Sequence, residues 1–423
     1  MSRFNRRGRL LLASALFVLA LGFAVARVGF LTEAGGVRLG ASWAMTDFYS
    51  AAYHPVHAVL QGQTPYERDS TFPPYAPTQL LVHLPFALLP PGPAAITYFL
   101  FTAVLTLPLA FLALGLARVK PEPARVMALA SAILLSRPGH WTLLLGQVAI
   151  LLTVLTYVAL LHARSKPTLA GWAIMGALLK PTYGIPLVLL LWTWGRRKTA
   201  ALGVALAALV NLPLLALLAA REGGFGELMK AALGGYRGWQ GIADVNPATS
   251  NTRTDATSLI SRFVGAPLSS VEQVLLTTGI LLLAVAVLRL LAKHPTRQAD
   301  TLAVGIICLT TSLIGFHRGY DLVLLTAPFV AAAVPGALPL GNRGVRWVLL
   351  ALYSILALNW IATESVLQRW QPSGGTWLLV TSVNGLCLIV LYLGYLGLSV
   401  QYHARILPRH ADDRIEVAPE SAT

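Results

Sequence analysis

Residues 1–30 read MSRFNRRGRLLLASALFVLALGFAVARVGF, in which four arginines precede an apolar run over residues 10–30. A helix needs about 20 apolar residues to cross the hydrocarbon core of a bilayer, so this run predicts a membrane span. Basic residues before a first span favour a cytoplasmic amino terminus, which makes residues 1–9 a cytoplasmic tail. Ala24-Val25-Ala26 also resembles a signal-peptidase site, so cleavage there is an alternative.

The rest of the chain has the same apolar character. Of its 423 residues, 56% are hydrophobic and only 12% are charged, whereas soluble globular proteins carry about 25% charged residues. A net charge of +15 would suggest nucleic acid in a soluble protein. Here the basic residues separate apolar runs, so we expect no nucleic-acid partner. Cys308 and Cys387 lie inside apolar runs and predict neither a disulfide framework nor a zinc site.

Eleven further apolar runs predict an all-α polytopic membrane protein with a bundle of about twelve transmembrane helices. The two runs on either side of Lys180-Pro181 are short for a bilayer, which favours bent or re-entrant helices there. Residues 10–400 are then one transmembrane domain, and residues 401–423 form a cytoplasmic, partly disordered tail. The eleven runs lie near residues 94–117, 124–136, 141–162, 168–179, 183–194, 199–220, 271–292, 299–316, 320–336, 347–363 and 376–399.

The charges between the runs give an orientation. An even number of spans places both termini in the cytoplasm, and the two cytoplasmic tails and the short cytoplasmic loops together then hold most of the Lys and Arg residues, as the positive-inside rule requires. The non-cytoplasmic face carries two long loops, near residues 31–93 and 221–270. Prolines between residues 73 and 93 exclude a regular spanning helix in the first loop and favour a short amphipathic element at the interface.

Ionisable residues near membrane depth are costly and are therefore candidates for function. In this topology they gather on the non-cytoplasmic side. The candidates are Asp47, Lys180, Arg253, Asp255, His317, Arg318 and Asp321, with Arg137 and His140 near another connection.

Each of these residues also has an ordinary structural explanation. Asp47 could cap a helix, and the Lys180 side chain could extend to the lipid headgroups. Arg318 and Asp321 could form an ion pair one helical turn apart. His317 could be a satisfied interfacial histidine, and Arg137 a loop charge.

Motifs of soluble enzymes are missing from the sequence. No G-x-S-x-G elbow, phosphate-binding P-loop or dinucleotide-type glycine fingerprint occurs in a strand-to-helix context. His54, His57 and His83 share no helix with carboxylates at metal-ligand spacing, so we predict no metal site. We expect no cofactor, and an activated substrate would have to arrive through the membrane.

The order of several short motifs resembles the polyprenol-phosphate-mannose-dependent mannosyltransferases of glycosyltransferase family 87, within the membrane GT-C superfamily. The resemblance covers about residues 10–400. Its motifs are Asp47-Phe48-Tyr49-Ser50-Ala51-Ala52, Leu60-Gln61-Gly62-Gln63-Thr64-Pro65-Tyr66, Phe72-Pro73-Pro74-Tyr75, Leu84-Pro85-Phe86-Ala87-Leu88-Leu89-Pro90, Gly146-Gln147, Ala170-Gly171, Lys180-Pro181, the polar loop that ends near Ser258, and the turn from His317 to Asp321.

This resemblance implies a GT-C-like bundle in the bacterial plasma membrane. Such an enzyme moves mannose from a polyprenyl-phosphate sugar to a hydroxyl group of a glycolipid or glycan acceptor, among membrane lipids and at the non-cytoplasmic face. Asp47 is carried over as the general base. Lys180 and His317, then Arg318 and Arg253, are the candidates for the donor phosphate. Candidates for orienting sugar or acceptor are Asp255, Asp321, Tyr49 and Gln147.

One departure from the family pattern and two other classes of protein bear on these assignments. Pro55 interrupts a helix that the family would continue, which would shift the orientation of Asp47. A secondary transporter also has about twelve spans and buried charges, but its halves usually show related repeats, which are missing here. A lipid-linked polysaccharide polymerase or ligase would use a pyrophosphate-linked donor instead.

Overall fold

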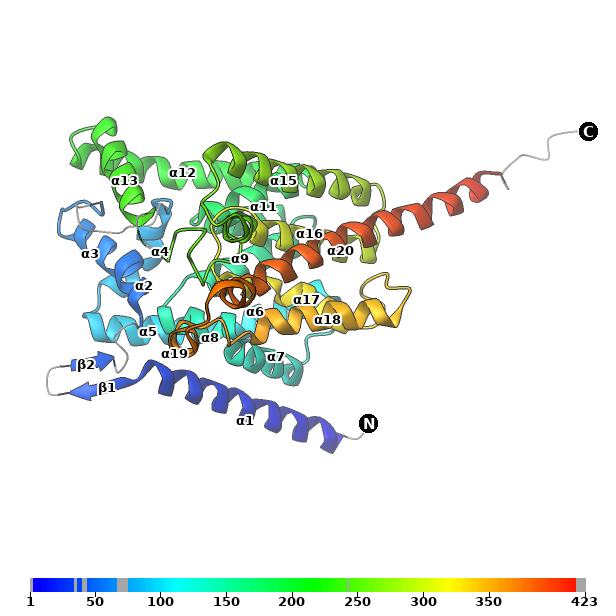
Figure 1. Cartoon of the computed structure of the whole chain (residues 1–423), viewed down its shortest axis with the longest axis horizontal. Coiled ribbons are helices and arrows are strands. Elements are labelled where there is room, and N and C mark those ends of the chain that lie inside the picture. Colours follow the sequence, from blue (N-terminus) through cyan, green and yellow to red (C-terminus); the bar gives the residue numbers. More distant parts are fainter. Residues whose placement is uncertain are drawn as a thin grey trace, which may run out of the picture.

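The computed structural model describes residues 3–33, 36–39, 44–66, 75–240, 242 and 244–415. Helices dominate these residues, which confirms the helical prediction (Figure 1). Strands β1 (Phe30–Glu33) and β2 (Gly36–Leu39) form an antiparallel hairpin directly after the first helix. The described part of the chain is therefore a helical bundle with one small hairpin.

Each predicted apolar run falls on one helix or on two consecutive helices. This agreement follows because long apolar runs bury their backbone hydrogen bonds best as helices. The helices are α1 (Arg3–Val28), α5 (Pro91–Val104) with α6 (Thr106–Leu116), α7 (Pro123–Leu135), α8 (Arg137–Leu145) with α9 (Ala149–His162), α10 (Pro167–Ala177), α11 (Pro181–Thr193), α12 (Arg197–Arg221), α15 (Ser270–Ala292), α16 (Arg297–Leu313), η2 (Gly319–Leu325) with α17 (Thr326–Ala333), α18 (Arg343–Leu358) and α20 (Gly374–Ile415).

The number of membrane spans is a separate question from the number of helices. Within the described residues, five helical segments are long and apolar enough to cross a membrane, by length and composition. The count of about twelve spans therefore stays a prediction. The five segments are Arg6–Val28, Pro91–Leu116, Arg197–Arg221, Ser270–Ala292 and Gly374–Ile406.

Several elements that lie outside the predicted apolar runs are found at one end of the bundle. The hairpin, α2 and α13 lie at the end opposite to both termini (Figure 1). Helix α4 contains Pro85, and α5 begins at Pro91, so no long helix crosses the proline-rich loop within its described part. The elements outside the predicted apolar runs and the hairpin are α2 (Thr46–Phe48), the π-helical turn η1 (Tyr49–Tyr53), α3 (His54–Leu60), α4 (Thr78–Ala87), α13 (Phe225–Gln240), α14 (Ala256–Val264) and α19 (Glu364–Trp370).

The carboxyl-terminal helix is longer than the last predicted span. Helix α20 continues from residue 399, where the apolar run ends, to Ile415. Residues 416–423 lie outside the described residues, and their disorder stays a prediction.

Contacts between the loops bring the basic segments together at one end. Asp300, at the start of α16, lies 3.2 Å from Arg118 in the α6–α7 loop and 3.8 Å from Arg196 before α12. The Thr199 hydroxyl donates to the Ala163 carbonyl at 2.7 Å, which joins the α9–α10 loop to the same group. A hydrogen bond of 2.9 Å between ring nitrogens of His294 and His403 joins α20 to the same group of loops. These loops carry the charges on which the predicted orientation rests.

Small residues let α10 pack closely against its neighbours. A Cβ atom at Gly176 would lie 2.8 Å from the Leu155 side chain on α9, and one at Gly203 on α12 would collide with Ile174 on α10. Close helix packing through glycine is common in membrane proteins. It brings α10 close to α9 and α12, and Lys180 lies three residues after the end of this helix.

Candidate active site

A cavity of about 720 Å³ lies where segments from distant parts of the sequence meet. It is bounded by α2, the ends of α8, α10 and α13, the loop before α14 and the turn before η2. Charged and amide side chains share its wall with aromatic rings. Among its lining residues are Asp47, Gln147, Lys180, Asp244, Asn246, Arg253 and Arg318, together with Tyr75, Tyr236, Trp239, Phe316 and Tyr320.

Asp47 is half-buried at the cavity wall. The Gln147 side-chain amide donates a hydrogen bond to its Oδ2 atom. No cation among the described residues forms an ion pair with this carboxylate. Burial raises the pKa of Asp47, and the charge of Arg318 and the bond from Gln147 only partly oppose that effect. A carboxylate of raised pKa that faces a cavity is suited to accept a proton.

The backbone around Asp47 is anchored from both sides. The Met45 amide donates to the Leu144 carbonyl at 2.7 Å. The buried ring of Phe48 stacks on Tyr98 with 4.6 Å between centroids. These contacts hold the short helix α2 against the end of α8 and against α5, so that Asp47 and Gln147 can meet although 100 positions separate them.

Pro55 lies just after the π-helical turn η1. Proline has no N–H to donate to the carbonyl four residues earlier, which belongs to Ala51. The buried Gln79 side chain donates to this carbonyl instead. The wider π turn lets the chain continue into α3 without a break, so the interruption predicted at Pro55 is a change of helix type.

Lys180, which lines the cavity, forms a buried ion pair with Asp321, which does not line it. The Lys180 ammonium lies 2.9 and 3.0 Å from the two Asp321 oxygens, with side chains 6% and 1% exposed. Asp321 also accepts from the Tyr183 hydroxyl at 3.0 Å and faces the His317 ring at 3.2 Å. Its negative charge is therefore surrounded by donors, as burial of a carboxylate requires.

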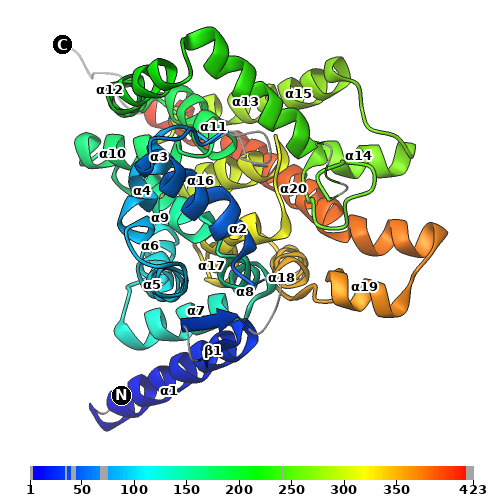
Figure 2. The same ribbon diagram turned by 90° about the vertical axis from the view of Figure 1, so that its left-hand side faces the viewer.

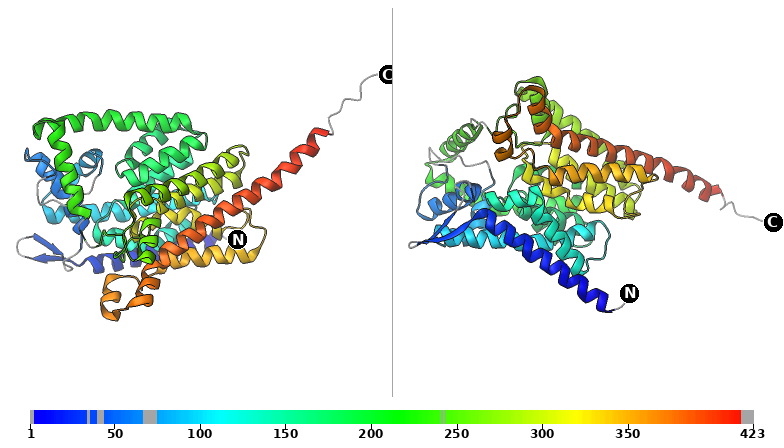
Figure 3. Two further views of the ribbon diagram at one scale, coloured as in Figure 1. Left: turned by 45° about the horizontal axis from the view of Figure 1, so that its top comes forward. Right: turned by 60° about the horizontal axis from the view of Figure 1, so that its bottom comes forward.

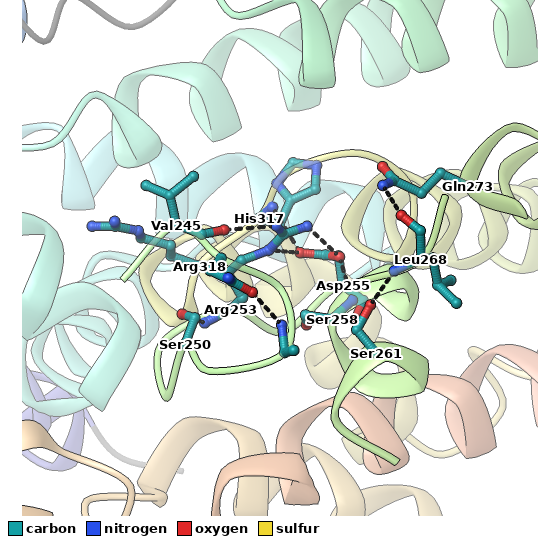
Figure 4. Close-up of polar contacts among 12 residues, drawn as sticks. Val245, Ser250, Arg253, Asp255, Ser258, Ser261, Leu268, Gln273, His317 and Arg318 are labelled. Atoms are coloured by element: carbon teal, nitrogen blue, oxygen red, sulfur yellow. Dashed lines mark hydrogen bonds and ion pairs between the residues drawn. The ribbon is translucent and has the colours of Figure 1, made fainter. Parts of the chain in front are cut away.

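A second buried pair joins Arg253 and Asp255 (Figure 4). The guanidinium donates two bonds of 2.9 Å to the carboxylate and a third to the Val245 carbonyl. Asp255 also caps α14 by accepting from the Ser258 amide at 2.9 Å. This aspartate thus has a structural role at a helix start.

The segments around these two pairs bond to each other through their backbones. The Thr254 amide donates to the His317 carbonyl, and the Gly319 amide donates to the Thr252 carbonyl, both at 3.0 Å. Residues 252–254 and 317–319 thus lie side by side. Any movement of one polar turn would move the other.

Arg318 is the cation with the most open environment. Its Nη2 atom lies 3.1 Å from an oxygen of Asp244, which is 40% exposed, and its Nε atom has no partner among the described residues. Asp244 accepts a further bond of 2.9 Å from Thr252. An anion that entered the cavity could therefore bind Arg318 by displacing or bridging a partly solvated partner.

The nine predicted site residues fall into two groups. Asp47, Gln147, Lys180, Arg253 and Arg318 line the cavity. The other four do not line it: the His317 ring is fully buried against Asp321, Asp255 and Asp321 lie beneath the wall, and the Tyr49 hydroxyl donates to the Pro91 carbonyl at 3.1 Å. The substrate contacts predicted for these nine residues stay predictions.

Sequence reasoning missed Asp244, Arg262 and the aromatic wall. Arg262 is buried and donates to the carbonyls of Ser250, Arg253 and Thr381, which fixes the loop before α14. The signal was present, since a lone arginine between Ser261 and Phe263 interrupts an apolar helix turn. Arg137, in contrast, donates to the Ala362 carbonyl at 2.7 Å and does not line the cavity.

Substitution of Gly146 tests whether the position of Asp47 matters. The Gly146 φ of 69° is left-handed, and a Cβ atom there would lie 2.5 Å from the Phe48 Cβ. Gly146→Ala should displace α2 and with it Asp47. We expect kcat for the predicted glycosyl transfer to fall by about 10- to 100-fold, because small errors in the position of a reacting group are costly. Gly279→Ala, within α15 and with open space around it, should leave kcat unchanged. Equal rates for both variants would show that the placement of α2 is unimportant.

Among the described residues, no group of three or more His, Cys, Asp or Glu side chains could hold a metal ion. The sequence model of glycosyltransferase family 87 matches residues 72–315, more than half of the chain. No curated protein matches the chain. The family match includes Gln147, Lys180, Arg253 and Asp255, whereas Asp47 and the turn from His317 to Asp321 lie outside it.

Proposed function

Because the chain belongs to glycosyltransferase family 87, we propose that it transfers mannose from a polyprenyl-phosphate donor to a hydroxyl group of a glycolipid or glycan acceptor. The observation that carries this proposal is the carboxylate of Asp47. It is half-buried, bonded to Gln147 and without an ion-pair partner among the described residues, and it faces a cavity that also holds three cations.

Asp47 acts as the general base of the transfer. It accepts the acceptor proton while the acceptor oxygen bonds to the anomeric carbon of the sugar. The bond between that carbon and the phosphate oxygen breaks, and its electron pair leaves with the polyprenyl phosphate. Gln147 orients the carboxylate by donating to one oxygen, which leaves the other for the acceptor.

Arg318 is the main partner of the donor phosphate. Its side chain is more exposed than those of Lys180 and Arg253, and its partner Asp244 is partly solvated, which makes it the most available of these cations. Guanidinium groups bind phosphate oxygens through two parallel hydrogen bonds. Arg253 and Lys180 add positive potential from their buried pairs, where developing charge on the leaving phosphate is stabilised. His317 acts indirectly, by positioning Asp321.

The aromatic wall binds the sugar ring. Trp239 meets Phe316 edge to face with 4.6 Å between centroids, and both line the cavity. Flat aromatic faces suit the apolar C–H face of a hexose. Asp244 and Asn246, from the loop between α13 and α14, provide polar partners for the hydroxyl groups of the sugar.

The proposed reaction takes place at the non-cytoplasmic face of the bacterial plasma membrane, with both termini in the cytoplasm. Two observations support this side. Helix α2, which carries Asp47, lies at the end opposite to both termini (Figure 1). The loops joined through Asp300 are rich in Lys and Arg, and the positive-inside rule favours the cytoplasm for such loops.

Purified chain assayed with two classes of donor tests the proposal. We expect transfer to an acceptor hydroxyl from polyprenyl-phosphate mannose and none from a polyprenyl-pyrophosphate oligosaccharide. Transfer from the pyrophosphate donor alone would favour the polymerase or ligase. Uptake of sugar into proteoliposomes, with transfer from neither donor, would favour a transporter and contradict the proposal.

A further inference from the structure

A second cleft, of about 600 Å³, lies at the basic end of the molecule between the first turns of α1 and α7. Figures 2 and 3 show these two helices side by side at the edge of the bundle. Arginines surround the cleft and short or apolar side chains form its floor. The lining residues are Arg6, Arg7, Arg9, Leu10, Leu12, Ala13, Leu16, Glu122, Pro123, Ala124, Arg125 and Ala128.

The charge in this cleft is strongly positive. Arg6 and Arg7 are exposed and have no acidic partner among the described residues. The one carboxylate that lines the cleft within those residues belongs to Glu122, and it lies 3.9 Å from Arg125. Four guanidinium groups against one carboxylate favour an anionic ligand, and guanidinium groups suit phosphate in particular.

The apolar residues that line the cleft indicate which kind of anion it binds. Leu12 and Leu16 are 63% and 44% exposed. They belong to a helix long and apolar enough to span a membrane. The apolar floor is therefore continuous with a surface that lipid chains would cover. A soluble phosphate would use the arginines and leave this floor bare, whereas a phospholipid would use both.

We propose that this cleft binds an anionic phospholipid, with the phosphodiester on Arg6 and Arg7 and an acyl chain along Leu12 and Leu16. Basic pockets between spans on the cytoplasmic side commonly bind such headgroups. The lipid fills the gap between α1 and α7 and fastens α1 to the bundle. This site lies at the end of the molecule opposite to α2, and it does not depend on the proposed sugar transfer (Figure 1).

Native mass spectrometry of the delipidated full chain measures the binding directly. We expect dioleoylphosphatidylglycerol to bind more tightly than dioleoylphosphatidylcholine. Arg6→Gln/Arg7→Gln should weaken phosphatidylglycerol binding by roughly thirtyfold, since each basic side chain near an anionic headgroup contributes a factor of about five. Glycerol 3-phosphate should not displace the lipid, because it has no acyl chain to cover the floor.

Two further variants separate the cleft from general charge and from folding. Arg197→Gln/Lys198→Gln removes two exposed charges outside the cleft, at the start of α12, and should leave binding unchanged. Ala124→Phe keeps every charge but fills the cleft, and should weaken binding as strongly as the arginine pair. Equal affinity for both lipids, equal loss in the two charge variants, or displacement by glycerol 3-phosphate would each overturn the proposal.

Discussion

Asp47→Asn is expected to lower kcat for sugar transfer by about a thousandfold, the middle of the range that a general base contributes. The substitution keeps the size of the side chain and a hydrogen bond with Gln147, but it removes the basic oxygen. Donor binding should change little, so KM stays near the wild-type value. Steady-state assays with polyprenyl-phosphate mannose measure both constants.

The pH dependence gives an independent measure of the same group. Asp47 must be ionised to accept a proton, so kcat/KM should fall as the pH drops through its pKa. Burial raises this pKa above the ordinary value of 3.8, and the acid limb should therefore lie above pH 3.8. Arg318→Gln removes a positive charge that lowers the pKa of Asp47, so the acid limb should move to higher pH.

Asp300→Asn is the matched control for Asp47→Asn. Asp300 belongs to the basic end, where it pairs with Arg118 and Arg196, and its side chain is 27% exposed. The same chemical change there should leave kcat within a factor of two or so of the wild type, because Asp300 does not line the cavity and its partly exposed pairs contribute about 1 kcal/mol or less to stability. A near wild-type rate for Asp47→Asn would remove Asp47 from the role of base.

The helices could be predicted from the sequence because their cause is local. An apolar run such as residues 199–220 buries its backbone as a helix whatever its neighbours are, and it becomes α12. The number of helices that cross the membrane depends on contacts between helices, which the local sequence does not specify. Helices as short as Pro181–Thr193 can cross, bend or stop inside a bundle, depending on the helices beside them.

In the site, too, some residues could be predicted from the local sequence and their partners could not. Asp47 was marked as a carboxylate shortly after the first apolar run, and Lys180 as a lysine between two short runs. Their partners could not be predicted, because they come from segments that only the tertiary fold brings together. Asp321 follows Lys180 by 141 positions, and Asp244 meets Arg318 from another loop. Sequence spacing also suggested Arg318 as the partner of Asp321, but its backbone amide makes that contact while its guanidinium binds Asp244.

The buried pair of Lys180 and Asp321 leads to the second large effect. Asp321→Asn should lower the free energy of unfolding by about 3–5 kcal/mol, because it leaves the Lys180 ammonium buried without a negative partner. The neutral amide can still accept from Tyr183, so the loss reflects charge more than hydrogen bonding. Thermal unfolding in detergent micelles measures the change. Asp300→Asn, at the partly exposed pairs, should shift the transition far less.

A second substitution distinguishes an unpaired charge from damage to the turn itself. Lys180→Met combined with Asp321→Asn removes the buried ammonium and keeps a side chain of similar length. If the unpaired charge causes the loss, the double variant should recover most of the stability, since replacing a buried pair by neutral groups is often close to neutral. Catalysis should stay impaired, because Lys180 no longer adds its positive charge near the leaving phosphate, although Arg318 and Arg253 remain. A double variant as unstable as Asp321→Asn would instead mean that Asp321 stabilises the fold through the turn around His317 and Arg318, where it accepts from the Arg318 backbone amide and contacts the His317 ring.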